Sequence, residues 1–237
     1  MPTLRVPTLQ HLARNWHDNP IRIKSALVGV VRHPPIFSYN CIFGAVRDRL
    51  LLNISYEQIV EGIKRGTKRE EDRDNFLEIL PLLNDFLESL SPAYVHGVKR
   101  RYYSVGRGLM VPFEPPISYG ENGVVHLPWF SFWRSNPLSA KRLSLFMTIV
   151  DEILREDPDL ENARFSILDF SLEKKGGIRS LEIIDSDDIP RLSEDEKYKM
   201  LSVFAEGYFL ALEELSKLAS RDEAEKKTED PNQLSLV

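Results

Sequence analysis

The sequence predicts an α+β fold, with a helical N-terminal half followed by a mainly antiparallel sheet whose helices pack on one face. Up to about residue 90, apolar residues recur at the spacing of helices. Beyond Pro92 the pattern changes, and residues 100–134 are rich in aromatic and β-branched residues that glycines and prolines interrupt. Two hairpin signals complete the expected order of the C-terminal half, β-β-β-α-β-β-α.

Five helices are expected before residue 92, at residues 9–16, 21–32, 39–51 and 56–64 and in a leucine-rich stretch that ends near residue 90. Ser55 and Gln58 form the capping-box pattern that begins the fourth of these helices. Pro81 lies inside the fifth helix and is expected to kink or divide it, because proline lacks the N–H that bonds to the preceding turn.

The first hairpin signal is Asn122-Gly123, because both residues tolerate the positive φ angles of a tight turn. This turn is expected to join strands at residues 117–120 and 124–132. An earlier strand is expected nearby, at about residues 101–111. Prolines in this region confine its strands to edges, bends and strand ends.

The remaining elements follow from helix boundaries and a second hairpin. Asn136-Pro137 is expected to begin a helix that Asp157-Pro158 ends. Strands at residues 164–172 and 178–185 then form the second hairpin. A long helix follows, beginning after Ser193.

The elements suggest two subdomains that meet near residue 95, a helical one at residues 1–95 and an α+β one at residues 96–219. Residues 220–237 are polar and charged, which is typical of a disordered tail. The single cysteine, Cys41, excludes an internal disulfide and fits a reducing compartment. No apolar stretch is long enough for a secretion signal or a membrane span, so a cytoplasmic protein without a membrane partner is expected.

Basic and aromatic residues are interleaved in the middle of the chain, and residues 97–150 carry seven Lys or Arg against two Asp or Glu. Aromatic faces stack on bases and cations bind phosphates, so this pattern suits single-stranded nucleic acid, with an acidic protein as the alternative partner. The expected contacts are Lys99, Arg100, Arg101, Arg107, Trp129, Trp133 and Arg134. The purely structural explanation is that the aromatic residues form a hairpin core while the basic residues stay solvated.

The second hairpin is acidic and suggests a different function. If residues 174–177 form its loop, Asp169 lies opposite Glu182 on the neighbouring strand. Like charges that face each other are unfavourable, and Mg²⁺ or a basic neighbour such as Arg179 would relieve the repulsion. In an enzyme, Asp169 and Glu182 would be the catalytic metal ligands, with Lys174 or Lys175 near a substrate phosphate.

Acidic residues on successive strands resemble the arrangement in PD-(D/E)xK nucleases, where carboxylates hold Mg²⁺ and a lysine aids the attacking water. The resemblance implies a metal-dependent phosphodiesterase. The chain departs from that motif, because Glu182 is followed by Ile183 and Ile184, with no lysine two residues on. The likeness is one of topology alone and assigns the chain to no family.

The leading hypothesis is therefore a non-catalytic binding or regulatory protein that needs no cofactor. The alternatives are the Mg²⁺-dependent phosphodiesterase and a structural subunit of a larger assembly. None of the five histidines has the spacing of a metal site with a second histidine or cysteine.

Overall fold

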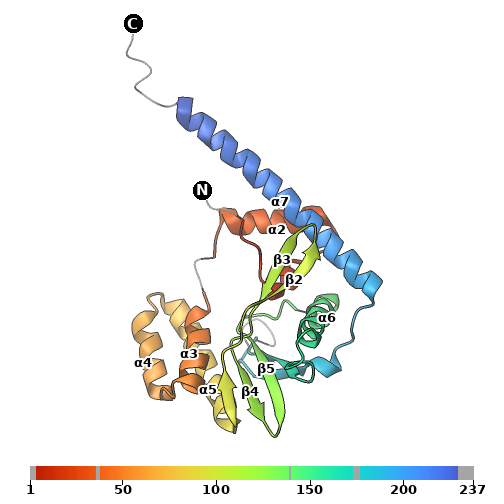
Figure 1. The fold of residues 1–237 in the computed structure, drawn as a ribbon. Helices are drawn as coiled ribbons and strands as arrows, with labels where there is room; N and C mark the ends of the chain where they lie inside the picture. The colour runs from red at the N-terminus through yellow and green to blue at the C-terminus, as the bar shows by residue number, and fades with distance from the viewer. Residues whose placement is uncertain (1–3, 36–37, 139, 173–176, 229–237) are drawn as a thin grey trace. The chain divides into compact units, whose positions relative to one another are not determined.

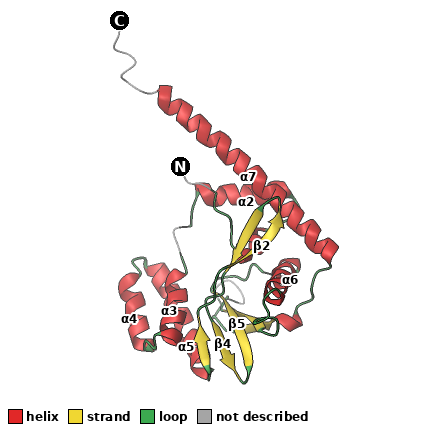
Figure 2. Ribbon diagram, viewed as in Figure 1, coloured by secondary structure: helices red, strands yellow, loops and turns green. Residues whose placement is uncertain are grey.

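The structure is a computed structural model that describes residues 4–35, 38–138, 140–172 and 177–228. Within these residues the chain forms seven α-helices and seven β-strands (Figures 1 and 2), which confirms the predicted α+β fold with a helical N-terminal half. The helices are α1 (Leu9–Asn15), α2 (Pro20–Arg32), α3 (Asn40–Leu51), α4 (Tyr56–Gly66), α5 (Glu70–Ser89), α6 (Lys141–Arg155) and α7 (Glu194–Thr228). The strands are β1 (Tyr94–His96), β2 (Arg101–Gly106), β3 (Leu109–Phe113), β4 (Ser118–Glu121), β5 (Val124–Ser131), β6 (Arg164–Asp169) and β7 (Glu182–Asp185), and a 3₁₀ turn, η1 (Ser186–Asp188), follows β7.

The chain divides into two compact units, and each unit combines separated segments of the sequence. The helical unit comprises Met1–Pro35, Ser104–Val111 and Glu194–Val237. The sheet unit comprises Ile36–Tyr103 and Pro112–Ser193. This division differs from the expected boundary near residue 95, because the helices of the N-terminal half do not stay together. α1 and α2 join α7 in the helical unit, whereas α3, α4 and α5 belong to the sheet unit.

In the helical unit, α2 and α7 approach each other closely. At Gly207 of α7, a Cβ atom would lie 2.7 Å from Cβ of Ile23 and 2.8 Å from the carbonyl oxygen of Pro20, so only glycine allows this approach. Lys24 of α2 also forms an ion pair with Glu214 of α7 at 2.7 Å. The first and last helical segments are therefore held together by backbone proximity as well as by side chains.

In the sheet unit, five strands form one sheet in the order β1-β4-β5-β6-β7. The predicted Asn122-Gly123 turn joins β4 to β5, and both residues have positive φ, 51° and 79°. Neighbouring strands are antiparallel except β5 and β6, which run parallel and are connected through α6. The sheet is therefore mainly antiparallel, as predicted, with one β-α-β crossover.

Helices lie against both faces of this sheet, whereas the sequence led us to expect them on one. Phe130 of β5 belongs to the core that α3, α4 and α5 complete. Trp129 of β5 and Phe165 of β6 instead contact Phe146 of α6, on the other face (Figure 1). The parallel pair is the cause, because two parallel strands need a crossover connection and its helix covers the remaining face.

Several element boundaries differ from those expected. α5 runs through Pro81 undivided, with the proline on its exposed side. α6 begins at Lys141 instead of near residue 137, because Asn136 accepts a hydrogen bond from the N–H of Leu138 at 2.8 Å and forms a turn there. α7 continues to Thr228, and residues 229–237 of the expected tail lie outside the described residues.

The single strand expected at residues 101–111 is a two-stranded hairpin, β2–β3. Its turn is Arg107-Gly108, with φ angles of 54° and 80°. Arginine is uncommon at positive φ, so the sequence did not mark this turn as clearly as it marked Asn122-Gly123.

Candidate functional site

Three predicted basic residues, Lys99, Arg100 and Arg101, lie at or just before the start of β2 and differ in their exposure to a partner. Arg101 is half-buried and forms an ion pair with Asp157, whose pKa this hydrogen bond lowers. Arg100 is exposed and lies 2.7 Å from Glu114, and this hydrogen bond raises the pKa of Arg100. Lys99 is exposed as well. Lys99 and Arg100 are therefore the two cations of this group that face solvent.

The other predicted contacts of the sheet unit lie on or near β5. Trp129 is 5% exposed and packs against Phe113 and Phe146, so its ring is closed to a partner, contrary to the prediction. The cause is that both faces of β5 are covered by helices. Trp133 is half-buried, and Arg134 donates from Nε to Oδ1 of Asn75 on α5 at 3.2 Å.

Arg107 belongs to the helical unit, unlike the other six predicted contacts. It lies at the tip of the β2–β3 hairpin, and its guanidinium carbon is 4.3 Å from the ring centroid of Phe209 on α7. A cation–π contact of this kind stabilises the docking of the hairpin tip on α7. The predicted contact set is thus divided between the two units.

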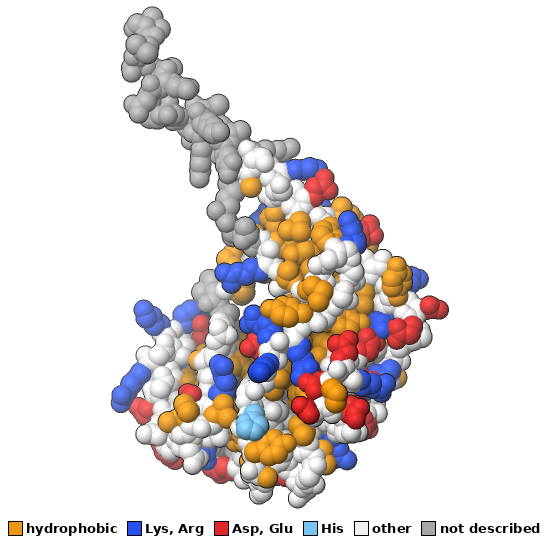
Figure 3. Space-filling model, in the orientation of Figure 1, with side chains coloured by type: hydrophobic (Ala, Val, Ile, Leu, Met, Phe, Trp, Pro, Cys, Tyr) orange, Lys and Arg blue, Asp and Glu red, His pale blue; other side chains and the backbone are white. Residues whose placement is uncertain are grey.

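Exposed aromatic side chains that the sequence analysis did not select accompany the two solvent-facing cations. Tyr94 and His96 of β1 are both exposed, and their rings stack with centroids 5.2 Å apart. Tyr102 of β2 is 54% exposed. We call residues 94–102 the aromatic-basic segment; it contains three basic residues and no carboxylate. On the face drawn in Figure 3, histidine, hydrophobic and basic side chains adjoin over the part of the sheet where β4 lies in Figure 1.

The position of Tyr94 depends on a glycine in the neighbouring strand. Tyr94 pairs with Gly120 of β4, and a Cβ atom at Gly120 would overlap the tyrosine ring. Val95, between the two exposed residues, packs against the core instead. The alternation of exposed and inward-facing side chains is the pattern of a strand, but β1 has only three residues, too few for the pattern to be recognised in the sequence.

The acidic hairpin has the register predicted for it. Asp169 of β6 pairs with Glu182 of β7, and Leu172 forms a bridge with Arg179. Asp169 is 3% exposed, and its two carboxylate oxygens accept hydrogen bonds from the N–H of Ser171 at 3.2 Å and from its hydroxyl at 3.0 Å. Glu182 is exposed. The two carboxylates therefore lie in different environments.

This hairpin brings together two carboxylates but no complete metal site within the described residues. Across the part of the chain that the structure describes, no group of three or more His, Cys, Asp or Glu side chains is placed to hold a metal ion. Lys174 and Lys175, the predicted phosphate contacts, lie outside the described residues. The register that the phosphodiesterase hypothesis required is therefore confirmed, but the described residues supply no third metal ligand beside Asp169 and Glu182.

Arg179, which was considered as a neutraliser of these acids, serves the opposite side of the sheet. Its guanidinium donates to the carbonyl oxygen of Phe170 and, at 2.5 Å, to Oδ1 of Asn75 on α5. Its Nε lies 3.5 Å from the carboxylate of Glu78. Burial lowers the pKa of Arg179, and the nearby Tyr39 and Glu78 oppose that shift. The network links α5 to the ends of the strands.

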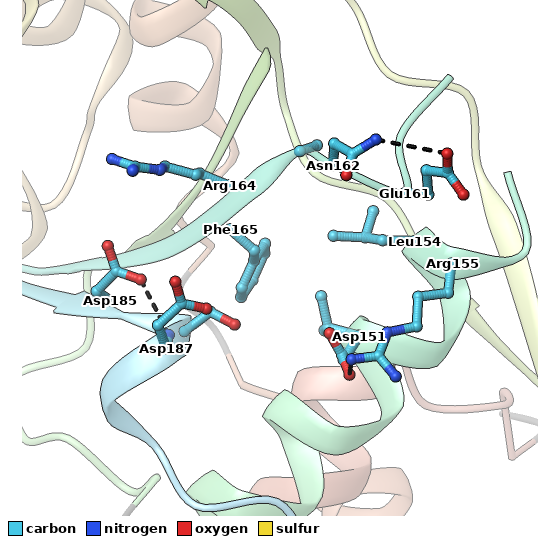
Figure 4. Close-up of a pocket in the computed structure, with 12 residues that line it drawn as sticks. Asp151, Leu154, Arg155, Glu161, Asn162, Arg164, Phe165, Asp185 and Asp187 are labelled. Atoms are coloured by element: carbon cyan, nitrogen blue, oxygen red, sulfur yellow. Dashed lines mark hydrogen bonds and ion pairs between the residues drawn. The ribbon is translucent and has the colours of Figure 1, made fainter. Parts of the chain in front are cut away.

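A cavity of about 290 Å³ lies elsewhere in the sheet unit, where the second half of α6, the start of β6 and η1 meet (Figure 4). Val150, Leu154 and Phe165 also line it, but their side chains are buried in the core, so the exposed lining is mainly polar. Charged residues make up much of the lining: Asp151, Glu161, Asp185 and Asp187 with carboxylates, and Arg155 and Arg164 with guanidinium groups. No sequence motif pointed to this cavity, because its walls come from three separate segments.

No family model matches the chain, and no curated protein sequence is similar to it. Among the described helices, none combines the length and the apolar character needed to span a membrane.

Proposed function

We propose that the protein is a non-catalytic binding protein that holds single-stranded nucleic acid on the aromatic-basic segment. The observation that carries this proposal is the presence of three exposed aromatic rings beside two exposed cations within residues 94–102. Every base offers a face on which an aromatic ring can stack, and every linkage carries a phosphate that a cation can bind.

Both cations are accessible to a phosphate. The ion pair between Arg100 and Glu114 is about half exposed on each side, and exposed pairs of this kind contribute little to stability. A phosphate can therefore replace Glu114 at small cost. Within the described residues Lys99 has no ion-pair partner, so it binds a phosphate without giving up another contact.

A Lys99→Ala/Arg100→Ala double variant is expected to bind a labelled single-stranded oligonucleotide about tenfold more weakly than the parent protein. The logarithm of its affinity should also fall less steeply with the logarithm of salt concentration, because fewer counterions are released. A Tyr102→Ala variant should bind about fivefold or more weakly, since a stacked base contributes roughly 1–3 kcal/mol. Fluorescence anisotropy over a salt series measures all three quantities.

The matched control removes two charges from another exposed part of the same unit, through Lys64→Ala and Arg65→Ala on α4. Equal weakening in the two double variants would contradict a defined site and indicate general charge attraction. Tyr102→Phe keeps the ring and should bind like the parent.

Other outcomes of the same titration separate the competing functions. If no oligonucleotide binds at low salt, the proposal fails and an acidic protein becomes the partner to seek. If the oligonucleotide is cleaved in Mg²⁺ but not in EDTA, and Asp169→Ala abolishes the cleavage, the phosphodiesterase hypothesis replaces it. A gel of the titrated mixtures distinguishes intact from cleaved strands.

A further inference from the structure

Two arginine side chains converge on one amide oxygen beyond the carboxyl ends of the parallel strands β5 and β6. Oδ1 of Asn75 on α5 accepts a hydrogen bond from Nε of Arg134 at 3.2 Å and another from Nη2 of Arg179 at 2.5 Å. In open α/β sheets, ligands bind in the region beyond the carboxyl ends of parallel strands. The position of this arginine pair is therefore one where a ligand is expected.

Backbone contacts hold together the segments that carry the two arginines. The N–H of Leu172 donates to the carbonyl oxygen of Arg134 at 3.0 Å, and Leu172 also forms a bridge with Arg179. The guanidinium of Arg179 donates in addition to the carbonyl oxygen of Phe170. Because these contacts and Asn75 fix the pair in advance, a ligand does not have to bring two like charges together when it binds.

The side chains of Asn75, Arg134 and Arg179 have unpaired donors and no unpaired acceptor. In the part of the chain that the structure describes, Nδ2 of Asn75 and Nε of Arg179 are buried and form no hydrogen bond. The carboxylate of Glu78 lies 3.5 Å from this Nε without bonding to it, and the Glu78 side chain is 63% exposed. The terminal nitrogens of Arg134, an exposed residue, have no partner among the described residues either. A buried donor without a partner is costly, so a ligand that accepts hydrogen bonds would relieve this cost.

The charge of the arginine pair favours an anion as that ligand. Two guanidinium groups are accompanied by one nearby carboxylate, that of Glu78, and within the described ranges no Asp or Glu forms an ion pair with Arg134. Burial is the main cause that lowers the pKa of Arg179, and the charge of Arg134 lowers it further. An anion with several oxygens can accept hydrogen bonds from both guanidinium groups, and its charge offsets their repulsion.

We propose that Arg134 and Arg179 bind a phosphate group, which displaces the carboxylate of Glu78 and accepts hydrogen bonds from both guanidinium groups. A phosphate dianion matches the two positive charges, and its terminal oxygens can accept from donors that come from different directions. The single charge of Glu78 balances only one of the two arginines. The source is either inorganic phosphate or the phosphate monoester of a small metabolite. The inference is independent of nucleic-acid binding at the aromatic-basic segment.

The test titrates the full chain with inorganic phosphate and with methyl phosphate, at constant ionic strength with chloride as the balancing anion. NMR follows the backbone amide signals and the Nε–H signal of Arg179, and at least one probe is expected to bind saturably and to shift that signal. Arg134→Gln should bind that probe about fivefold or more weakly, because it removes one of the two charges. Glu78→Gln should bind it about twofold or more tightly, because the competing carboxylate loses its charge.

Two controls decide whether the arginine pair is responsible. Arg47→Gln changes another exposed arginine of the same unit, on α3, and should leave phosphate binding unchanged. The Lys99→Ala/Arg100→Ala variant should also bind phosphate like the parent, which separates this site from the aromatic-basic segment. The proposal is overturned if neither probe binds saturably, if Arg134→Gln binds as tightly as the parent, or if the control variants lose as much affinity as Arg134→Gln. Tighter binding of methyl phosphate would identify a monoester as the source, and tighter binding of inorganic phosphate the free ion.

Discussion

Replacement of Arg179 by methionine is expected to lower the free energy of unfolding by about 2–4 kcal/mol. Methionine occupies a similar volume, but it removes the hydrogen bonds that Arg179 donates to the carbonyl oxygens of Phe170 and Trp133 and to Oδ1 of Asn75. The loss is large because the arginine side chain is only 3% exposed, so water cannot replace the missing bonds. Urea denaturation followed by circular dichroism measures the change.

The matched control is the same substitution at Arg65 of α4, whose side chain is 83% exposed. Arg65→Met should change stability by less than about 0.5 kcal/mol, as substitutions on an open surface usually do. Arg179→Lys retains the charge but not the forked set of donors, so it should fall between the parent and Arg179→Met. A loss below about 1 kcal/mol in Arg179→Met would refute the role of this network in anchoring α5.

Gly207→Ala is expected to cost about 2–3 kcal/mol, the second largest effect that the structure predicts. The added methyl group would meet the side chain of Ile23 and the backbone of Pro20 at less than 3 Å, so α2 and α7 must move apart. Alanine itself favours a helix over glycine by about 1 kcal/mol, and the steric cost must therefore exceed that gain. Urea denaturation gives the net change.

Gly29→Ala, in α2 of the same unit, is the control with the opposite expected sign. Apart from its chain neighbours and the backbone of its own helix, no atom lies within 4 Å of a Cβ at Gly29, so only the helix preference acts. A gain of about 0.5–1 kcal/mol is expected. Because the two substitutions are chemically identical, the difference between them isolates the contact between α2 and α7. Two variants of equal stability would show that the close approach does not exist in solution.

The elements that the sequence predicted well are those set by neighbouring residues. The capping box of Ser55 and Gln58 forms as expected, with hydrogen bonds of 3.1 and 3.3 Å. The turn at Asn122-Gly123 and the register of Asp169 against Glu182 also follow from local pattern. Helix continuity at Pro81 was not predicted, because it depends on tertiary packing and not on local sequence. α5 continues through Pro81 because buried residues on both sides of the proline pack into the core.

The candidate sites were harder to predict, because exposure depends on which faces of the sheet are covered. The aromatic composition around Trp129 is compatible both with a ring exposed to solvent and with a ring packed against α6. The parallel pairing of β5 with β6, which places α6 over this face, determines that the ring is buried. Tyr94 was overlooked because β1 is so short. The cavity required α6, β6 and η1 to meet, and no spacing in the sequence encodes that meeting.

The pairing of α2 with α7 determines the order in which the chain can fold during synthesis. The helical unit includes α7, which begins at Glu194. After α2 is synthesised, more than 150 further residues must be translated before α7 can pack against it. At about 5–20 residues per second, that interval is on the order of ten seconds or more. Throughout it, the apolar stripe that α7 will cover, with Ile23 at its centre, has no native partner. During this interval a chaperone that covers the N-terminal helices would protect the stripe from aggregation.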